Sequence, residues 1–186
     1  LPSGRLRDWR SAYHRADLIV VSKCPPALPQ NAREQMAAEL NPMPWQSVFF
    51  SYYKYGVPYE MLRTEIRQPL LAEMDLLLIS AIAGTGYLLD FLKEKVRSVQ
   101  SVEFADHHFF GELDLEEIKR RFSGLPRVSS IILTTEKDAM RLELHQAFFE
   151  KNNLPIFVLP IEVGFHGGDE ARFRAEVQQW LTDFRA

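Results

Sequence analysis

Short β-branched or aliphatic runs alternate along this chain with stretches whose apolar residues recur at helical spacing. The continuous run DLLLISAIA (residues 75–83) predicts a strand buried on both faces of a sheet. After it, Leu88, Leu92 and Val96 recur as one face of a helix does. Repeated strand–helix units predict an α/β fold with a mostly parallel sheet and helices on both faces, in three layers.

The same alternation continues on both sides of this unit. Further strands are predicted at residues 17–24, 47–56, 99–105, 128–135 and 154–163. Further helices are predicted where apolar residues share a face: Met36 and Leu40; Leu115, Ile118 and Phe122; Met140, Leu144, Ala147 and Phe148; Phe173, Val177, Trp180, Leu181 and Phe184. Pro58, Pro69 and mixed charges predict a boundary near residues 56–74, between an earlier two-strand piece and a later four-strand unit.

Composition excludes several classes of protein. The net charge of −3 leaves no overall electrostatic footprint for a nucleic-acid partner. Cys24 is the only cysteine, so an internal disulfide cannot form, which fits a reducing cytoplasm. The most apolar window, residues 76–89, is too short and too interrupted by Ser, Thr and Gly to cross a bilayer. Because the chain starts at Leu1 within what reads as a running motif, we expect a fragment that lacks its N-terminal half.

The segment AGTGYLL follows a predicted strand and opens a helix, as a phosphate-binding loop does. A P-loop also needs a Lys after its last glycine, and none of the nine glycines here is followed by Lys. We therefore interpret Gly84 and Gly86 as residues that permit a tight strand-to-helix turn, and we expect no P-loop in this chain.

Polar residues also follow other strands, at the edge where α/β sheets bind ligands. In TTEKDAMRL, Thr135 is predicted to cap a helix with Asp138 as its partner. Lys137 would then be exposed at this edge and could face an anionic group. Lys23, at the end of the strand DLIVVSKC, is a similar candidate.

The segment FADHH places Asp106, His107 and His108 at a strand end. An imidazole beside a carboxylate can form a base that works near neutral pH. Adjacent side chains diverge in extended backbone, so all three are not expected to bind one metal ion, and we predict no metal site. Asp106 could instead cap the following turn, although Asp114 and Glu117 form a better pair for the helix start. The residues alone leave both readings open.

Several segments together resemble the second half of the tetraacyldisaccharide 4′-kinase family, lipid A pathway kinases of Gram-negative bacteria. The segments are LPSGRLRDWRSAYHRADLIVVSKCPP, VFFSYYKYG, LLLISAIA, FADHHFF, IILTTEKDAMRL and LPIEVGF. The resemblance covers almost the whole chain. It implies a P-loop kinase of two lobes joined by a β-ribbon. Residues 1–57 would be a remnant of the N-terminal lobe plus a linker strand, and residues 58–186 the C-terminal α/β domain.

The resemblance also implies an activity. The family transfers the γ-phosphate of ATP, with Mg²⁺, to the 4′-hydroxyl of tetraacyldisaccharide 1-phosphate, giving lipid IVA. It works as a peripheral enzyme at the cytoplasmic face of the inner membrane. The family pattern Asp-His carries an active-site role to Asp106 and His107, and His108 stays unassigned. The P-loop and the magnesium ligands would lie ahead of residue 1, so we expect this chain alone to bind no ATP and to be inactive.

Two other functions fit parts of the sequence. The letters DHH suggest a metal-dependent phosphoesterase, but the further Asp-x-Asp ligands of that class are missing. The chain could also be a non-catalytic module that binds an anion through Lys137 or the arginines near its start.

Overall fold

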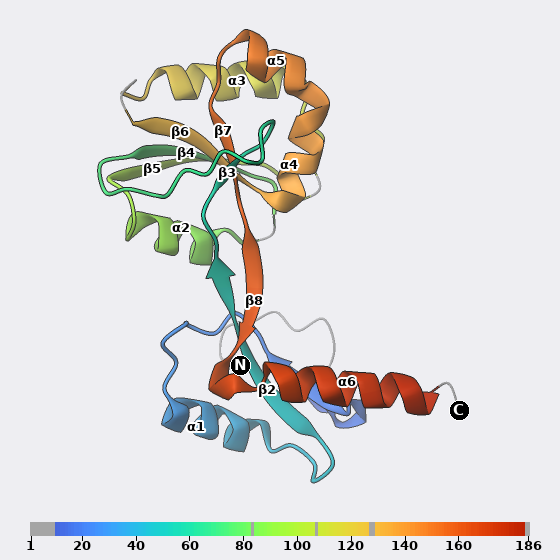
Figure 1. The fold of residues 1–186 in the computed structure, drawn as a ribbon. Coiled ribbons are helices and arrows are strands. Elements are labelled where there is room, and N and C mark those ends of the chain that lie inside the picture. The colour runs from blue at the N-terminus through green and yellow to red at the C-terminus, as the bar shows by residue number, and fades with distance from the viewer. Residues whose placement is uncertain (1–9, 83, 107, 127–128, 185–186) are drawn as a thin grey trace. The chain divides into compact units, whose positions relative to one another are not determined.

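The structure, a computed structural model, describes residues 10–82, 84–106, 108–126 and 129–184. Its backbone divides into two compact units (Figure 1): residues 1–54 with 163–186, and residues 55–162. The chain leaves the first unit through one strand and returns to it through another. The domain assignment from the sequence followed chain order, which contains no sign of this return, and so placed residues 163–186 with the later domain.

The second unit contains a five-stranded sheet in the order β3-β7-β6-β4-β5. The strands are β3 (Tyr59–Glu60), β4 (Asp75–Ser80), β5 (Ser98–Glu103), β6 (Ser130–Thr135) and β7 (Ile156–Leu159). The β3 strand is antiparallel to β7, and the other neighbours are parallel. The predicted α/β class with a mostly parallel sheet is confirmed. The short β3 strand was not predicted, because two residues carry no periodic signal.

Helices cover both faces of this sheet (Figure 1). On one face lie α3 (Glu112–Ser123), α4 (Glu136–Leu142) and α5 (Gln146–Lys151), and on the other α2 (Gly86–Lys93). Alternate residues of β4 separate the two cores: Leu77 packs with Ile118 of α3, while Leu78 packs with Leu92 of α2. Every residue of β4 and β6 is buried, as expected for central strands of a sheet covered on both faces.

The helix predicted after β6 is wrong in its face and its continuity. The chain forms α4, a 3₁₀ turn (Glu143–His145) and α5 in place of one helix. Met140 is 74% exposed and Leu144 77% exposed, whereas Ala139, Leu142 and Phe149 are buried. The fully buried residues are therefore not the predicted ones, although Phe148, which was predicted, is partly buried against the same core. Both sets of residues have helical spacing, and only packing against the sheet selects between them.

The strand predicted at residues 154–163 is also split. Pro160, which has no N–H to donate, separates β7 from β8 (Ile161–Phe165), and the two strands belong to different sheets. The Pro160 carbonyl accepts a hydrogen bond from the Gly56 N–H at 2.9 Å. The apolar run at residues 154–163 thus contributes one strand to the sheet of each unit.

The first unit has a three-stranded sheet in the order β1-β2-β8. Its elements, in chain order, are a 3₁₀ helix (Arg10–Arg15), β1 (Leu18–Val21), α1 (Gln30–Leu40), β2 (Ser47–Tyr55), β8, a second 3₁₀ turn (His166–Gly168) and α6 (Glu170–Phe184). The ring of Phe49 lies edge-on to Phe173 at 5.2 Å, and the Arg172 guanidinium lies 4.3 Å from the Phe49 ring centre. Among the described residues, α1 and α6 contain none that is fully buried.

An ion pair fixes the register of β4 against β5. Asp75, paired in register with Ser98, accepts hydrogen bonds from Arg97 Nε at 3.0 Å and from the Ser98 hydroxyl at 2.6 Å. A second Arg97 nitrogen bonds the other carboxylate oxygen. These contacts, Arg97 first, lower the pKa of Asp75 to about 2.

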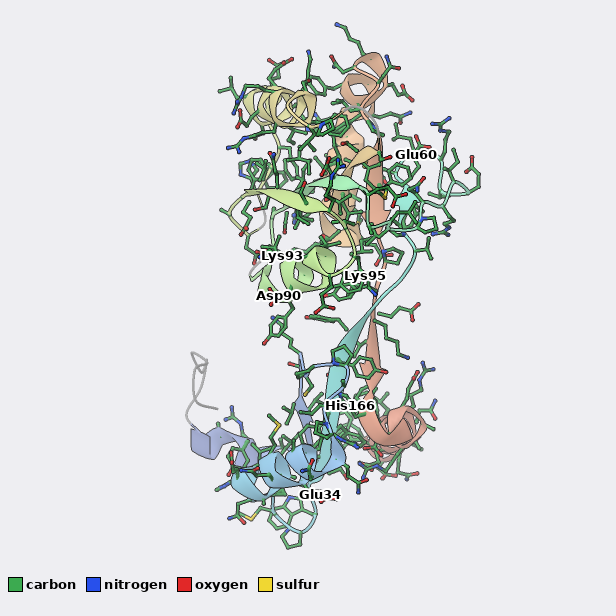
Figure 2. The ribbon with its side chains drawn as sticks, turned by 90° about the vertical axis from the view of Figure 1, so that its left-hand side faces the viewer. Glu34, Glu60, Asp90, Lys93, Lys95 and His166 are labelled. Carbon is green, nitrogen blue, oxygen red and sulfur yellow. The ribbon has the colours of Figure 1, made fainter. Side chains whose placement is uncertain are left out.

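This pKa predicts how stability depends on pH. Because the pKa is lower in the folded state than in the unfolded chain, the stabilisation is complete above the ordinary carboxyl pKa and is lost as the pH falls toward 2. We expect Asp75→Asn to melt below the unmodified chain at pH 7, with the difference shrinking between pH 5 and pH 2. Asp90→Asn on the exposed face of α2 (Figure 2) is the control. A melting difference that does not change with pH would contradict this assignment.

Candidate functional site

The candidate site lies at the carboxyl edge of β4, β5 and β6 in the second unit. Since these strands are parallel, the segments that follow them meet at one edge of the sheet. The segments are residues 81–85, residues 104–111 and the first turn of α4.

Asp138 joins two of these segments. It is completely buried, and its Oδ2 accepts hydrogen bonds from the Ala81 N–H at 3.0 Å and the Thr135 hydroxyl at 2.9 Å. The Thr135 hydroxyl in turn accepts the Asp138 N–H at 3.4 Å, so the predicted cap is confirmed. Arg141 lies 3.6 Å from the other carboxylate oxygen. Asp138 therefore fixes the start of α4 against the end of β4. The bonded residues are 57 positions apart in the chain, and the cap pattern did not reveal this contact.

The loop after β4 is a turn and not a phosphate cradle. Gly84 has φ of +82°, a left-handed conformation that glycine adopts without strain, whereas nothing in the structure requires a glycine at position 86. The Thr85 hydroxyl donates to Glu103 Oε2 at 3.0 Å. With that hydroxyl on Glu103 and no Lys in the loop, these residues do not fit a triphosphate.

Asp106 and Lys137 meet across two segments. Lys137 Nζ donates to Asp106 Oδ1 at 2.7 Å, and both side chains are 42% exposed. From the sequence, Lys137 was expected to be exposed at this edge, where it could face an anionic ligand; in the structure it bonds the Asp106 carboxylate. His107, the other predicted catalytic residue, lies outside the described residues.

The side chain of His108 makes structural contacts with Asp114 and Phe104. Its Nε2 lies 2.8 Å from Asp114 Oδ2, and its ring stacks on Phe104 with centroids 4.7 Å apart. The same Asp114 oxygen accepts the Gly111 N–H at 2.8 Å, so Asp114 is the third residue of α3 and bonds back to the cap residue Gly111. The predicted pairing of Asp114 with Glu117 at the helix start is wrong, because Glu117 bonds Arg120 and Arg121. Burial acts to raise the pKa of Asp114, but the Gly111 N–H and His108 outweigh it, so this pKa lies below its ordinary value. His108 thus holds the loop onto α3.

The remaining candidates lie in the first unit. Lys23 follows β1, is exposed, and has a left-handed φ of 60°. His166, which no sequence pattern singled out, lies buried at the end of β8, with its ring centre 4.7 Å from that of Tyr52 (Figure 2). Burial, with help from the Arg33 cation, lowers the pKa of His166, so the ring is neutral at pH 7. We read His166 as part of the packing around β2.

Neither a metal site nor a membrane-spanning helix is found among the described residues. Across the described residues, no three or more His, Cys, Asp or Glu side chains converge as a metal ion would need. Within the same residues, no helix combines the length and apolar character that crossing a membrane requires.

Comparison with known proteins points to one family. The family model of tetraacyldisaccharide-1-P 4′-kinase (LpxK) matches residues 1–182. The tetraacyldisaccharide 4′-kinase of Bacteroides fragilis strain YCH46 is 34% identical over 189 residues, which cover 98% of this chain and 50% of that protein. The corresponding protein of Bacteroides thetaiotaomicron is 33% identical over 193 residues. The chain spans about half the length of these relatives.

A solved structure also matches. The crystal structure of LpxK from Aquifex aeolicus in complex with ATP is 19% identical to this chain, with a TM-score of 0.48. The match covers 96% of this chain and 47% of the other.

The Asp138 link predicts a stability effect. Asp138→Ala leaves the buried Ala81 N–H without its acceptor, which costs about 1–3 kcal/mol in the free energy of unfolding. Asp138→Asn keeps one carbonyl oxygen for that N–H and should lose less. Urea denaturation of both variants measures the difference. Equal stability of the Ala variant and the unmodified chain would show that the link contributes nothing.

Proposed function

Because the chain belongs to the tetraacyldisaccharide-1-P 4′-kinase family, we propose that it is the C-terminal part of an enzyme that phosphorylates the 4′-hydroxyl of tetraacyldisaccharide 1-phosphate, giving lipid IVA. The observation that carries this proposal is the family match along residues 1–182. The phosphate donor is ATP with Mg²⁺.

The nucleotide belongs to a part of the enzyme that precedes this chain. Two observations support this: the relatives are about twice as long, and the one loop here that resembles a phosphate cradle does not fit one. We use "complete kinase" for a protein in which this chain follows its nucleotide-binding half.

The first unit is a part of that nucleotide-binding lobe, and β2 and β8, which carry the chain between the units, form the linker ribbon. In support, few side chains are buried among the described residues of the first unit. Trp180 is 49% exposed, Leu181 47% and Phe184 77%, all on α6. Such apolar side chains are usually covered by a partner surface. The rest of the lobe is the partner we propose.

Asp106 and His107 act on the acceptor sugar. Phosphoryl transfer depends on positioning and on a group that accepts the proton of the attacking hydroxyl. The Asp106 carboxylate is accessible at the sheet edge, and His107 follows it directly in the chain. In this role the pair orients the 4′-hydroxyl and takes up its proton. The acceptor is a lipid, so the complete kinase works in peripheral contact with the cytoplasmic face of the inner membrane.

The two alternative functions are less well supported. A DHH phosphoesterase would need the further Asp-x-Asp ligands that the sequence lacks, and here His108 stacks on Phe104 and bonds Asp114. An anion-binding module would use Lys137 or the arginines near the start of the chain, and Lys137 instead bonds Asp106.

The catalytic proposal predicts a loss of turnover. His107→Ala in the complete kinase should reduce kcat about 100- to 10,000-fold, the usual contribution of a general base, while the KM for ATP changes little. His145→Ala, a substitution in the 3₁₀ turn after α4, serves as the control. Near-normal kcat in the His107 variant would rule out its catalytic role.

A second prediction concerns the chain by itself. The 186-residue protein should show no magnesium-dependent ATP hydrolysis and no transfer to tetraacyldisaccharide 1-phosphate, because it lacks a phosphate-binding loop. Release of labelled phosphate measures both. Turnover that copurifies with the chain and disappears in its His107→Ala variant would contradict the proposal.

A further inference from the structure

We infer that Lys137 is a positioning residue of this kinase, which holds the Asp106 carboxylate at the sheet edge through its ammonium group. The inference rests on the proposed function of Asp106. Its basis is the 2.7 Å bond between Lys137 Nζ and Asp106 Oδ1, which joins residues 31 positions apart in the chain.

The backbone that carries Lys137 is held in place by its neighbours in α4. Lys137 is the second residue of α4, between Glu136 and the buried Asp138. Asp138 bonds both Thr135 and the end of β4, so the first turn of α4 cannot shift without breaking buried hydrogen bonds. The ammonium group therefore extends from a well-anchored backbone.

The aspartate side is held at two points that flank it. Before Asp106, the Phe104 N–H donates to the Ser80 carbonyl at 2.8 Å. After it, His108 bonds Asp114 and its N–H donates to the Ala105 carbonyl at 3.0 Å. These contacts fix the loop ends. The bond from Lys137 acts on the Asp106 carboxylate itself.

Energetics favour a role in positioning over one in stability. An ion pair this exposed contributes little to folding, because solvent screens it. A displacement of a reacting group by about 1 Å can reduce a rate about 100-fold. Removing the ammonium group should therefore change turnover much more than melting temperature, a combination that a purely structural lysine would not produce.

The test uses four variants of the complete kinase: Lys137→Met, Lys137→Arg, Asp106→Asn and the double variant Lys137→Met/Asp106→Asn. Lys119→Met is the matched control, because Lys119 is 40% exposed and forms a comparable surface pair with Glu116 at 3.5 Å. We expect Lys137→Met to lower kcat about 10- to 100-fold with KM for both substrates and the melting temperature nearly unchanged. Lys137→Arg, which can still donate to Asp106, should recover most of the loss.

The double variant separates positioning from direct substrate binding. If Lys137 acts through Asp106, the double variant is no slower than Asp106→Asn alone. If Lys137 binds a substrate phosphate, Lys137→Met raises KM and slows the enzyme equally with or without Asp106, and the inference is overturned.

The outcomes also distinguish this inference from the proposed function. Full turnover by Asp106→Asn would remove the proposed site and the inference together. A slow Asp106→Asn beside a Lys137→Met with normal kcat would overturn the inference alone. A slow Lys137→Met beside a normal Lys119→Met supports it.

Discussion

The buried Asp138 carboxylate is the interaction on which the candidate site depends. It accepts hydrogen bonds from the end of β4 and from the Thr135 hydroxyl, and so sets where α4 begins. Both hydrogen bonds go to Oδ2, whereas Oδ1 has no hydrogen bond from the described residues and lies 3.6 Å from Arg141, so the arrangement depends on the Oδ2 contacts to offset the cost of burying the carboxylate. The position of Lys137, one residue earlier, follows from it. Through Lys137 the same anchor reaches Asp106, on a different loop.

The second constraint is that Asp106 and His108, both in the segment FADHH, make different contacts. His108 turns back onto Phe104 and Asp114, where it closes the loop against α3. Asp106 stays accessible beside α4. The His108 imidazole fastens the loop, while Asp106 remains accessible at the sheet edge. This separation explains physically why Asp106 and His108 need not share one function.

Much of the fold could be predicted because hydrophobic periodicity reports burial directly. The runs that became β4 and β6 read as buried strands, and Thr135 with Asp138 read as a cap. Predictions of the fold failed where several hydrophobic patterns fit the sequence equally well, or where contacts between distant residues determine the structure. The stripe through Met140 and the one through Ala139 have the same period, and only contact with the sheet buries the second.

The site shows the same limit. Each of its residues could be placed at a strand end from the sequence, but their partners could not. Asp138 bonds Ala81, which is 57 positions away in the chain, and Lys137 bonds Asp106, which is 31 positions away. Such pairs depend on strand order, which local spacing does not encode. The two-residue β3 strand and the return of β8 to the first unit were missed for the same reason.

The decisive measurement is transfer of labelled γ-phosphate from ATP by the complete kinase to tetraacyldisaccharide 1-phosphate, followed by mass analysis of the lipid. We expect one added phosphate at the 4′ position of the sugar. A purified, folded protein that hydrolyses ATP but leaves this lipid unmodified would contradict it.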